Sequence, residues 1–423
     1  MYLLCGLIDS VISKTGYEVG CMKNIIFISP NFPENYRFFC RALKENGMNV
    51  LGIGDQPYDE LFAELKESLT EYYKVDSLED YDQVYRACAF LAFKYGKIDW
   101  LESNNEYWLE QDAALRKDFN IRTGFHPEDM ERVKYKSRMK EFYAKAGIPA
   151  ARYHLVEGKE DCLSFIQKIG YPVIVKPDNG VGASHTYKLK CEQDLDDFLA
   201  ERSEQYPDVP FIMEEFVNAT VNSYDAIIDP DGNILFETGN VTLRSIMDTV
   251  NDAETSLCYI RKSLPDKVRN AGRAAVKAFG VKGRFVHFEF FCLDIDQEGL
   301  GKKGDIIGLE VNMRPAGVFI PDMMNYAHST DVYKIWADMV AFGKTEVEQK
   351  DHRFCLFVGR RDEASYKLSD EAAAEKYDAN ILEVFRLPDA VSASMGNTVT
   401  IAVFDEEEDM MRFITEMDER ISE

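Results

Sequence analysis

Hydrophobic and polar positions along the chain follow two periods that predict different elements. In residues 284–294 and 306–314 every second side chain is apolar, which predicts two half-buried strands joined as a hairpin through the turn-rich stretch 297–304. The uninterrupted β-branched run 173–175 predicts a strand buried on both faces. In residues 24–53 a strand, a helix and a second strand follow one another, which predicts a right-handed βαβ unit of a parallel sheet.

The same two periods predict the other elements. Apolar stripes at helical spacing predict helices, and β-branched or aromatic runs bounded by glycine, proline or aspartate predict strands. The expected helices are 34–46, 78–95, 106–117, 128–146, 160–169, 192–205, 265–279, 369–377 and 406–420. The expected strands outside the hairpin are 24–29, 49–53, 98–101, 152–156, 172–176, 211–217, 223–229, 233–241, 354–359, 381–386 and 398–404.

These elements predict an α/β and α+β protein of several domains. Residues 22–125 are expected to form a parallel α/β domain, residues 126–345 a second domain with a subdomain at about 150–217, and residues 346–423 a small α/β lobe. Residues 1–21 show little periodicity, and we expect them to lie outside the folded core. Either these residues come from translation that begins at an upstream start codon, or they form a short extra element.

Composition narrows the classes of partner. The 423 residues are 46% hydrophobic, which is enough to fill several cores. A formal net charge of −25 excludes a nucleic-acid partner, because most of the surface would repel a phosphate backbone. No apolar run reaches the ~18 residues of a membrane span, so no membrane partner is expected. Nine scattered cysteines without a Cys-x-x-Cys pair indicate reduced thiols, a cytoplasmic location and no zinc framework.

The end of the buried strand carries residues suited to ligand binding. Lys176 stands where that strand meets a loop, and Gly180 and Gly182 allow backbone N–H groups of the loop to approach a ligand closely. This arrangement suits a phosphate chain held by a cation. The loop matches neither the Walker pattern nor Gly-x-Gly-x-x-Gly after a strand. On these residues alone, an ordinary hairpin with a solvated lysine is the alternative.

The hairpin places ionisable side chains on one face. If the pairing is centred on its turn, Glu289 lies across from Glu310, and His287 lies across from Asn312. Two carboxylates about 5 Å apart repel unless a cation lies between them or one takes a proton. Mg²⁺, with Mn²⁺ as an alternative, suits two carboxylates and the Asn312 amide oxygen. A solvated polar face and an acid/base pair acting on a glycoside remain open alternatives.

Six separate pieces of the sequence resemble the ATP-grasp superfamily in order and spacing, over about residues 120–345. This resemblance implies an N-terminal pre-ATP-grasp α/β domain followed by an ATP-grasp fold. The pieces are Lys136, Lys176, the Gly180 loop, Met213-Glu214-Glu215-Phe216-Val217, Glu289, and Glu310-Val311-Asn312-Met313-Arg314-Pro315.

The resemblance also implies a role for each matching residue. Glu289, Glu310 and Asn312 would bind Mg²⁺, and Lys176 and Arg314 would act in catalysis. Arg314 would meet the substrate carboxylate or the acyl phosphate, and Arg244 is a candidate second anion contact. Residues 214–217 would be the hinge that binds adenine. Many relatives carry Gly-x-Glu after this hinge to bind ribose; this chain does not, and Asn222 is the candidate substitute. The implied ATP-binding residues are Lys136, Lys176, Gly180, Gly182, Ala183, Ser184, Glu214, Glu215, Phe216, Val217 and Asn222.

Such a set implies an ATP-dependent ligase that activates a carboxylate as an acyl phosphate and joins it to an amine. The partners would be small-molecule acids and amines, and a homodimer is compatible with the family. Three alternatives stay open. They are a biotin-carboxylase-like or purine-pathway enzyme that uses a one-carbon acid, a non-catalytic ATP-binding sensor, and a subunit of a larger synthetase.

Overall fold

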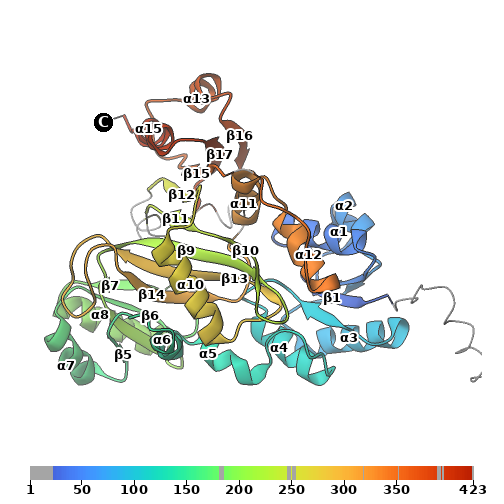
Figure 1. Ribbon diagram of the computed structural model, residues 1–423. Helices are drawn as coiled ribbons and strands as arrows, with labels where there is room; N and C mark the ends of the chain where they lie inside the picture. The colour runs from blue at the N-terminus through green and yellow to red at the C-terminus, as the bar shows by residue number, and fades with distance from the viewer. Residues whose placement is uncertain are drawn as a thin grey trace, which may run out of the picture.

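The computed structural model describes residues 22–180, 185–244, 254–317, 319–350, 352–387 and 395–421, together with residues 249 and 392. Three β-sheets organise these residues: a parallel sheet, a small antiparallel sheet and a long antiparallel sheet (Figure 1). The predicted class, an α/β domain followed by α+β domains, is confirmed. The expectation for residues 1–21 concerns a segment outside the described residues.

The N-terminal residues form the predicted parallel sheet, with strand order β3-β2-β1-β4. The βαβ unit is confirmed, because β1 and β2 pair in parallel with a helix between them. Strand β3 and helix α2 were not predicted. Both are short and partly exposed, so their sequences lack a strong apolar pattern. The elements are β1 (Asn24–Ile28), α1 (Arg37–Glu45), β2 (Asn49–Gly54), α2 (Ala63–Ser68), β3 (Glu71–Lys74), α3 (Tyr81–Tyr95), β4 (Trp100–Glu102) and α4 (Leu109–Asp118).

The small antiparallel sheet, with order β5-β8-β6-β7, lies at the lower left of Figure 1 beside two helices. Apolar side chains of the helices and strands form its own core, which includes Cys162, Val175 and Phe198. Helix α8 has the predicted bounds. The elements are β5 (Tyr153–Leu155), α7 (Lys159–Ile169), β6 (Val173–Pro177), β7 (Tyr187–Leu189), α8 (Glu192–Gln205) and β8 (Phe211–Glu215).

The long sheet contains the predicted hairpin. Glu289 pairs with Glu310 and His287 with Asn312, so the predicted register is confirmed at these positions. Beyond Glu289 the register shifts by one residue at a bulge. The strands are β9 (Ala219–Ile228), β10 (Ile234–Thr238), β11 (Asn240–Thr242), β12 (Ser256–Ile260), β13 (Arg284–Leu293), β14 (Ile306–Asn312), β15 (Phe354–Arg360), β16 (Ile381–Arg386) and β17 (Thr398–Phe404).

The predicted continuous helix 128–146 is wrong. It is two helices, α5 (Met130–Lys134) and α6 (Lys136–Lys145), that meet at Tyr135. Tyr135 has extended backbone angles and forms a β-bridge with Asn179. The chain therefore leaves the helical path to pair with the loop that follows β6. Helices α5, α6 and α10 (Asp266–Phe279) form a core with β13 and β14.

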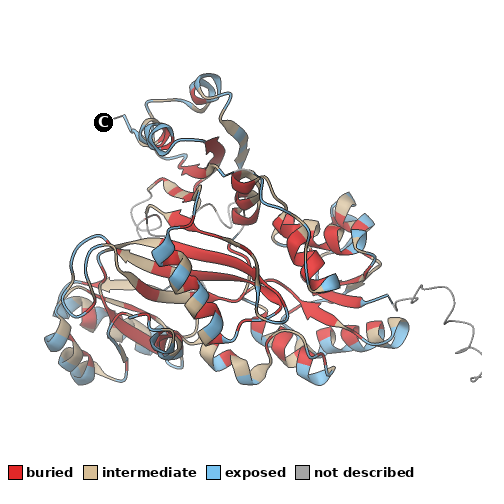
Figure 2. Cartoon of the chain, viewed as in Figure 1, coloured by how far each residue is buried: buried red, intermediate tan, exposed pale blue. Residues whose placement is uncertain are grey.

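The C-terminal strands β15, β17 and β16 extend the long sheet, because β12 pairs with both β11 and β15. Neither β12 nor the helices α11 (Ile320–His328) and α12 (Val332–Phe342) were predicted. Helix α12 packs on the N-terminal domain beside α1 (Figures 1 and 2). Its buried Trp336 contacts the ring of Phe39. The remaining helices are α13 (Asp370–Lys376) and α15 (Glu407–Asp418), and none of the described helices is long and apolar enough to cross a membrane.

A buried charge network joins the N-terminal domain to the long sheet. The Glu102 carboxylate at the end of β4 lies 2.9 Å from Arg116 Nη2 and 3.4 Å from Arg284 Nη2. Arg284, at the start of β13, also donates from Nε to the Met313 carbonyl oxygen at 3.0 Å. The three charged side chains are almost entirely buried. The network therefore holds the end of β4 close to the segment that carries Arg314.

Candidate active site

Helix α6 carries two lysines and a tyrosine on one face because of their spacing. Lys136, Lys140 and Tyr143 follow one another at i, i+4 and i+7, so they share one face of the helix. The Tyr143 hydroxyl donates to the Glu310 carbonyl oxygen at 2.9 Å. A Cβ atom on Gly308 would lie 2.5 Å from the Tyr143 ring, so this glycine permits the helix to approach β14 closely. Lys140 was missed as a candidate, although its spacing from Lys136 was visible.

Three buried lysines, Lys136, Lys140 and Lys176, form what we call the lysine cluster. Lys140 Nζ and Lys176 Nζ lie 2.6 and 2.8 Å from the two carboxylate oxygens of Glu214. Lys136 Nζ donates to the Gly180 carbonyl oxygen at 3.0 Å. Two ammonium groups therefore share a single carboxylate. The predicted residues Lys136, Lys176 and Gly180 come together here, whereas Gly182, Ala183 and Ser184 lie outside the described residues.

Shifted pKa values follow from this shared charge. Burial opposes ionisation of Glu214, but the two lysines outweigh it and lower the pKa of Glu214 to about 2. Burial, together with the positive charge of Lys176, lowers the pKa of Lys140. Burial also works against the charge of Lys176, yet Glu214 and Glu310 raise its pKa. The cluster thus keeps more positive than negative charge, which favours an anionic ligand.

We expect Glu214→Gln to reduce stability in a pH-dependent way. The pKa of Glu214 is about 2 in the folded protein, below its ordinary value of 4.5. The ionised carboxylate therefore stabilises the folded protein above pH 4.5, and this stabilisation is lost as the pH falls towards 2. At pH 7 the free energy of unfolding of the variant should be lower than that of the wild-type protein by about 3 kcal/mol. Urea unfolding between pH 7 and pH 3 measures the difference, which should shrink with falling pH. The exposed α8 variant Glu204→Gln is the control, and a difference that does not change with pH would contradict the assignment.

Glu289, Glu310 and Asn312 form a row of oxygen ligands, which we call the carboxylate row. The Glu310 and Glu289 side chains are 18% and 28% exposed, so a ligand can reach both. Lys136 Nζ lies 3.4 Å from Glu310 Oε1, and Asn312 Oδ1 accepts from Arg314 Nη2 at 3.2 Å. The described residues contain no group of three or more His, Cys, Asp or Glu side chains placed to hold a metal. Two opposed carboxylates and an amide oxygen nevertheless fit Mg²⁺, which takes one or two carboxylates and completes its shell with phosphate and water.

A buried aspartate and histidine stand behind this row. His287 Nδ1 lies 2.7 Å from Asp225 Oδ1, and His287 Nε2 lies 3.1 Å from Glu289 Oε1. Burial disfavours the charged ring, but the two carboxylates, Asp225 foremost, raise the pKa of His287 to about 10. Burial likewise opposes ionisation of Glu289, yet His287 lowers the pKa of Glu289. Asp225 was missed from sequence, because its partner on β13 becomes visible only once the β9–β13 register is known.

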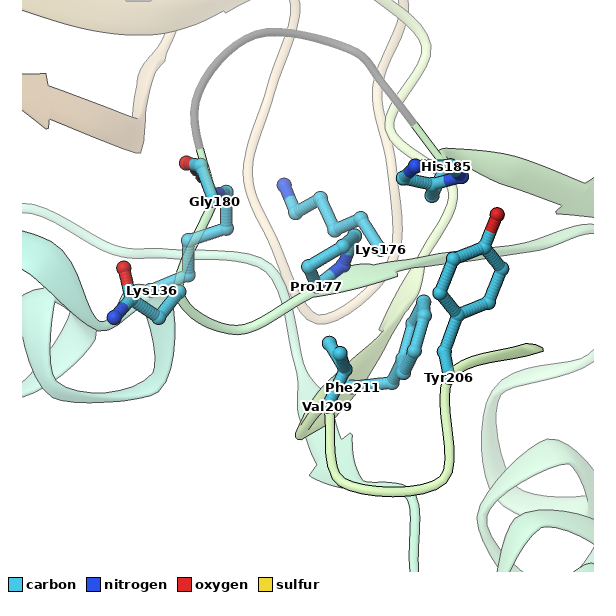
Figure 3. Close-up of a pocket in the computed structure, with 9 residues that line it drawn as sticks. Lys136, Lys176, Pro177, Gly180, His185, Tyr206, Val209 and Phe211 are labelled. Atoms are coloured by element: carbon cyan, nitrogen blue, oxygen red, sulfur yellow. Dashed lines mark hydrogen bonds between the residues drawn. The ribbon is translucent and has the colours of Figure 1, made fainter. Parts of the chain in front are cut away.

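A cavity of about 260 Å³ opens above the lysine cluster (Figure 3). The Lys176 side chain lies between Lys136 and Gly180 on one side and His185 and Tyr206 on the other. His185 and Tyr206 pack with ring centroids 4.6 Å apart, so His185 closes one wall. The cavity therefore combines an apolar wall with lysine ammonium groups, as a nucleotide requires. Its lining residues are Lys136, Lys176, Pro177, Asn179, Gly180, His185, Tyr206, Val209 and Phe211.

The predicted hinge, residues 214–217, comprises the last two residues of β8 and the two residues that follow. The Glu215 carboxylate accepts from the Arg152 backbone N–H at 2.6 Å and from Arg152 Nε at 2.9 Å. This carboxylate is therefore already paired with Arg152. Lys188 Nζ lies 3.8 Å from the centroid of the Phe216 ring, and Val217 is buried. These contacts hold the hinge in place. Two of its backbone groups are also engaged, because the Glu215 N–H donates to the Arg152 carbonyl oxygen at 3.0 Å and the Phe216 carbonyl oxygen accepts from Gln297 Nε2 at 2.8 Å.

Two further candidates make contacts of their own. The buried Asn222 accepts from Arg261 Nη2 through Oδ1 at 2.8 Å. Arg244 lies 3.0 Å from Glu254 and also pairs with Asp418 of α15. Two carboxylates thus already neutralise Arg244, and none of its contacts with described residues involves the lysine cluster or the carboxylate row. The structure does not bring Arg244 together with Arg314.

The carboxyl ends of β1 and β4 carry polar groups that the sequence analysis did not assign. Ser29 and Asn104 both have positive φ angles, an uncommon conformation that recurs at ligand sites. Both side-chain polar atoms of Asn104 and one carboxylate oxygen of Glu106 are buried and have no hydrogen-bond partner among the described residues. Burial raises the pKa of Glu106, and the charges of Lys134, Arg314 and Glu310 also act on this carboxyl. The Glu106 carboxyl therefore lies near the carboxylate row.

Solved structures with the same architecture identify the fold. An L-amino acid ligase from Bacillus licheniformis matches with a TM-score of 0.68 at 14% identity, over 95% of this chain and 99% of that chain. An ADP complex of purK, N5-carboxyaminoimidazole ribonucleotide synthetase, gives 0.66 at 15% identity, over 93% and 96%. The biotin carboxylase domain dimer of the Hydrogenobacter thermophilus 2-oxoglutarate carboxylase, with MgADP and bicarbonate, gives 0.65 at 17% identity, over 95% and 91%. These likenesses show that the chain has the ATP-grasp fold, as predicted.

Sequence comparison adds curated relatives. The large chain of carbamoyl phosphate synthase from Pseudarthrobacter chlorophenolicus is 26% identical over 252 residues, which is 57% of this chain and 22% of that protein. The L-arginine-specific L-amino acid ligase of Bacillus subtilis is 30% identical over 181 residues, 42% of each. The matched segment is thus less than half of either relative's length. No protein-family model matches the chain.

Proposed function

We propose that the protein is an ATP-dependent ligase that activates a carboxylate as an acyl phosphate and joins it to an amine. One observation carries the proposal: the lysine cluster and the carboxylate row meet, with Lys136 Nζ 3.4 Å from Glu310 Oε1. Phosphate-binding cations and oxygen ligands for a hard metal therefore face the same space. Phosphoryl transfer needs this combination, since its catalysis rests on positioning and charge neutralisation.

In the first half-reaction a carboxylate oxygen of the acid attacks the γ-phosphorus of ATP, and ADP leaves. Lys136 and Lys176 hold the phosphates, and the backbone that follows β8 meets the adenine. Glu289, Glu310 and Asn312 would hold Mg²⁺, which when bound neutralises charge on the phosphates. Arg314, beside Asn312, meets the carboxylate and then the acyl phosphate. The cavity walls limit the access of water to this mixed anhydride.

In the second half-reaction the amine nitrogen attacks the acyl carbon, phosphate leaves, and the amine gives up a proton. The amine enters from the N-terminal domain, where Glu106 and Asn104 present buried polar atoms without a partner among the described residues. Glu106 Oε1 lies 3.6 Å from Lys134 Nζ, and its other carboxyl oxygen and the Asn104 amide oxygen offer acceptors for the N–H groups of a neutral amine. The product is an amide or peptide-like bond.

Phosphate release from ATP and Mg²⁺ tests the proposal, with amino acids, small carboxylic acids and bicarbonate supplied singly and in pairs. We expect release that requires an acid and an amine together. Release with bicarbonate as the acid would instead favour the one-carbon alternative, to which the carbamoyl phosphate synthase relatives point. ATP binding without release under any pair would contradict a ligase and favour the sensor.

A cytoplasmic location and a homodimer complete the proposal. The seven cysteines that the structure describes are all unpaired thiols, which suits a reducing compartment. The biotin carboxylase domain with the same fold is a dimer. Gel filtration of the pure protein measures the assembly, and a mass of about 48.5 kDa would show a monomer instead.

A further inference from the structure

We propose that Asp225 and His287 are positioning residues that orient Glu289 for a divalent cation. The inference rests on the proposed function in one respect, that Glu289 is a metal ligand. Asp225 and His287 do not touch the substrates in this account. They act through the carboxylate of Glu289 alone.

A continuous chain of hydrogen bonds leads from the interior of the long sheet to the carboxylate row. The backbone N–H of Asn240 on β11 donates to Ser223 Oγ at 2.8 Å, and the Ser223 hydroxyl donates to Asp225 Oδ2. Asp225 Oδ1 lies 2.7 Å from His287 Nδ1, and His287 Nε2 lies 3.1 Å from Glu289 Oε1. Each oxygen of Asp225 thus has its own partner. The chain crosses three adjacent strands, β11, β9 and β13.

The sheet register sets this geometry. In the β9–β13 pairing, Asp225 lies opposite His287 and Ser223 lies opposite Glu289. The four side chains therefore occupy two adjacent rows on one face of the sheet. Asp225 is fully buried, Ser223 and His287 nearly so, and only Glu289 reaches the accessible space. Of the four side chains in this series, only that of Glu289, at its end, is accessible to a ligand.

Both ring nitrogens of His287 face carboxylate oxygens, so both act as hydrogen-bond donors. The bond from Nε2 engages Oε1 of Glu289, which restricts rotation of the carboxylate and leaves Oε2 for a cation. Hydrogen-bonded partners behind metal ligands typically change metal affinity by about 10- to 100-fold when they are replaced. A glutamate on a free side chain would instead lose conformational entropy each time the ion binds.

Mn²⁺ binding to the full chain with ADP tests the inference, with free Mn²⁺ followed by electron paramagnetic resonance. The variants are His287→Gln, Asp225→Asn and the double variant, and thermal unfolding shows that each is folded. His328→Gln is the matched control, because His328 is also buried but contacts Thr238 and His352. No acid or amine is needed, so the measurement stands apart from ligase activity.

We expect His287→Gln to weaken Mn²⁺ binding by about 10- to 100-fold and Asp225→Asn by about 10-fold. The double variant should match His287→Gln, because Asp225 acts only through His287. The Mg²⁺ concentration for half-maximal activity should rise while the KM for ATP stays constant. Folded single variants with the wild-type Kd, or effects that add in the double variant, would overturn the inference. Should the wild-type protein with ADP fail to bind Mn²⁺, the metal site in the proposed function would be wrong and the inference would fall with it.

Discussion

Glu310→Gln is expected to lower ATP turnover by at least about 1,000-fold while ATP binding stays measurable. Glutamine keeps the shape of the side chain but removes the negative charge that faces Lys136 at 3.4 Å. The carboxylate row then has one carboxylate, Glu289, and holds Mg²⁺ weakly at the transferring phosphate. The lysine cluster keeps Glu214 and its surplus positive charge, so ATP still binds.

Phosphate release and a fluorescent ATP analogue measure the two effects on the same preparation. The control is Glu298→Gln, a glutamate exposed in the turn of the same hairpin. We expect Glu298→Gln to behave as the wild type in both assays. Turnover of Glu310→Gln within tenfold of the wild type would show that Glu310 holds no catalytic metal.

Glu102→Gln is expected to lower the free energy of unfolding by about 3 to 5 kcal/mol. Glu102 pairs with the guanidinium groups of Arg116 and Arg284, and all three side chains are buried. The substitution leaves two buried positive charges with less compensation. Asp112 lies 3.9 Å from Arg116. Burial, the largest effect, raises the pKa of Asp112 to about 7, so this carboxyl neutralises the two arginines only in part.

Urea unfolding at pH 6, below the pKa of Asp112, measures this effect, and Glu419→Gln on the surface is the control. Glu419 pairs with Lys367, and both side chains are more than half exposed, so its loss should change stability by less than about 1 kcal/mol. Since Arg284 also binds the Met313 carbonyl next to Arg314, Glu102→Gln should raise the KM for the acid as well. Equal stability of the two variants would contradict the structural role of the network.

The site could be predicted from sequence where a local pattern determined its geometry. Alternating residues and a single turn-rich stretch set the register of the hairpin, so the opposition of Glu289 and Glu310 followed from counting. The βαβ unit followed in the same way from apolar runs separated by one helix. Lys176 was marked by its place at the end of a buried strand.

Long-range pairing accounts for what could not be predicted. The role of Glu214 as the shared partner of Lys140 and Lys176 depends on α6 docking against β8, which no local pattern encodes. Asp225 meets His287 only because β9 lies beside β13. The sequence of α12 is apolar, as in a buried segment, but it does not reveal where the helix packs. Its partner is the N-terminal domain, some 300 residues earlier in the chain.

The transfer of an oxygen atom from the acid to phosphate tests the central claim most directly. Once phosphate release has identified an acid and an amine, the acid is supplied with ¹⁸O in its carboxylate, and the released phosphate is analysed by mass spectrometry. Activation as an acyl phosphate predicts one ¹⁸O atom in each phosphate that the wild-type protein releases. Phosphate released by the wild-type protein without the label would show that water attacks ATP, and would contradict carboxylate activation.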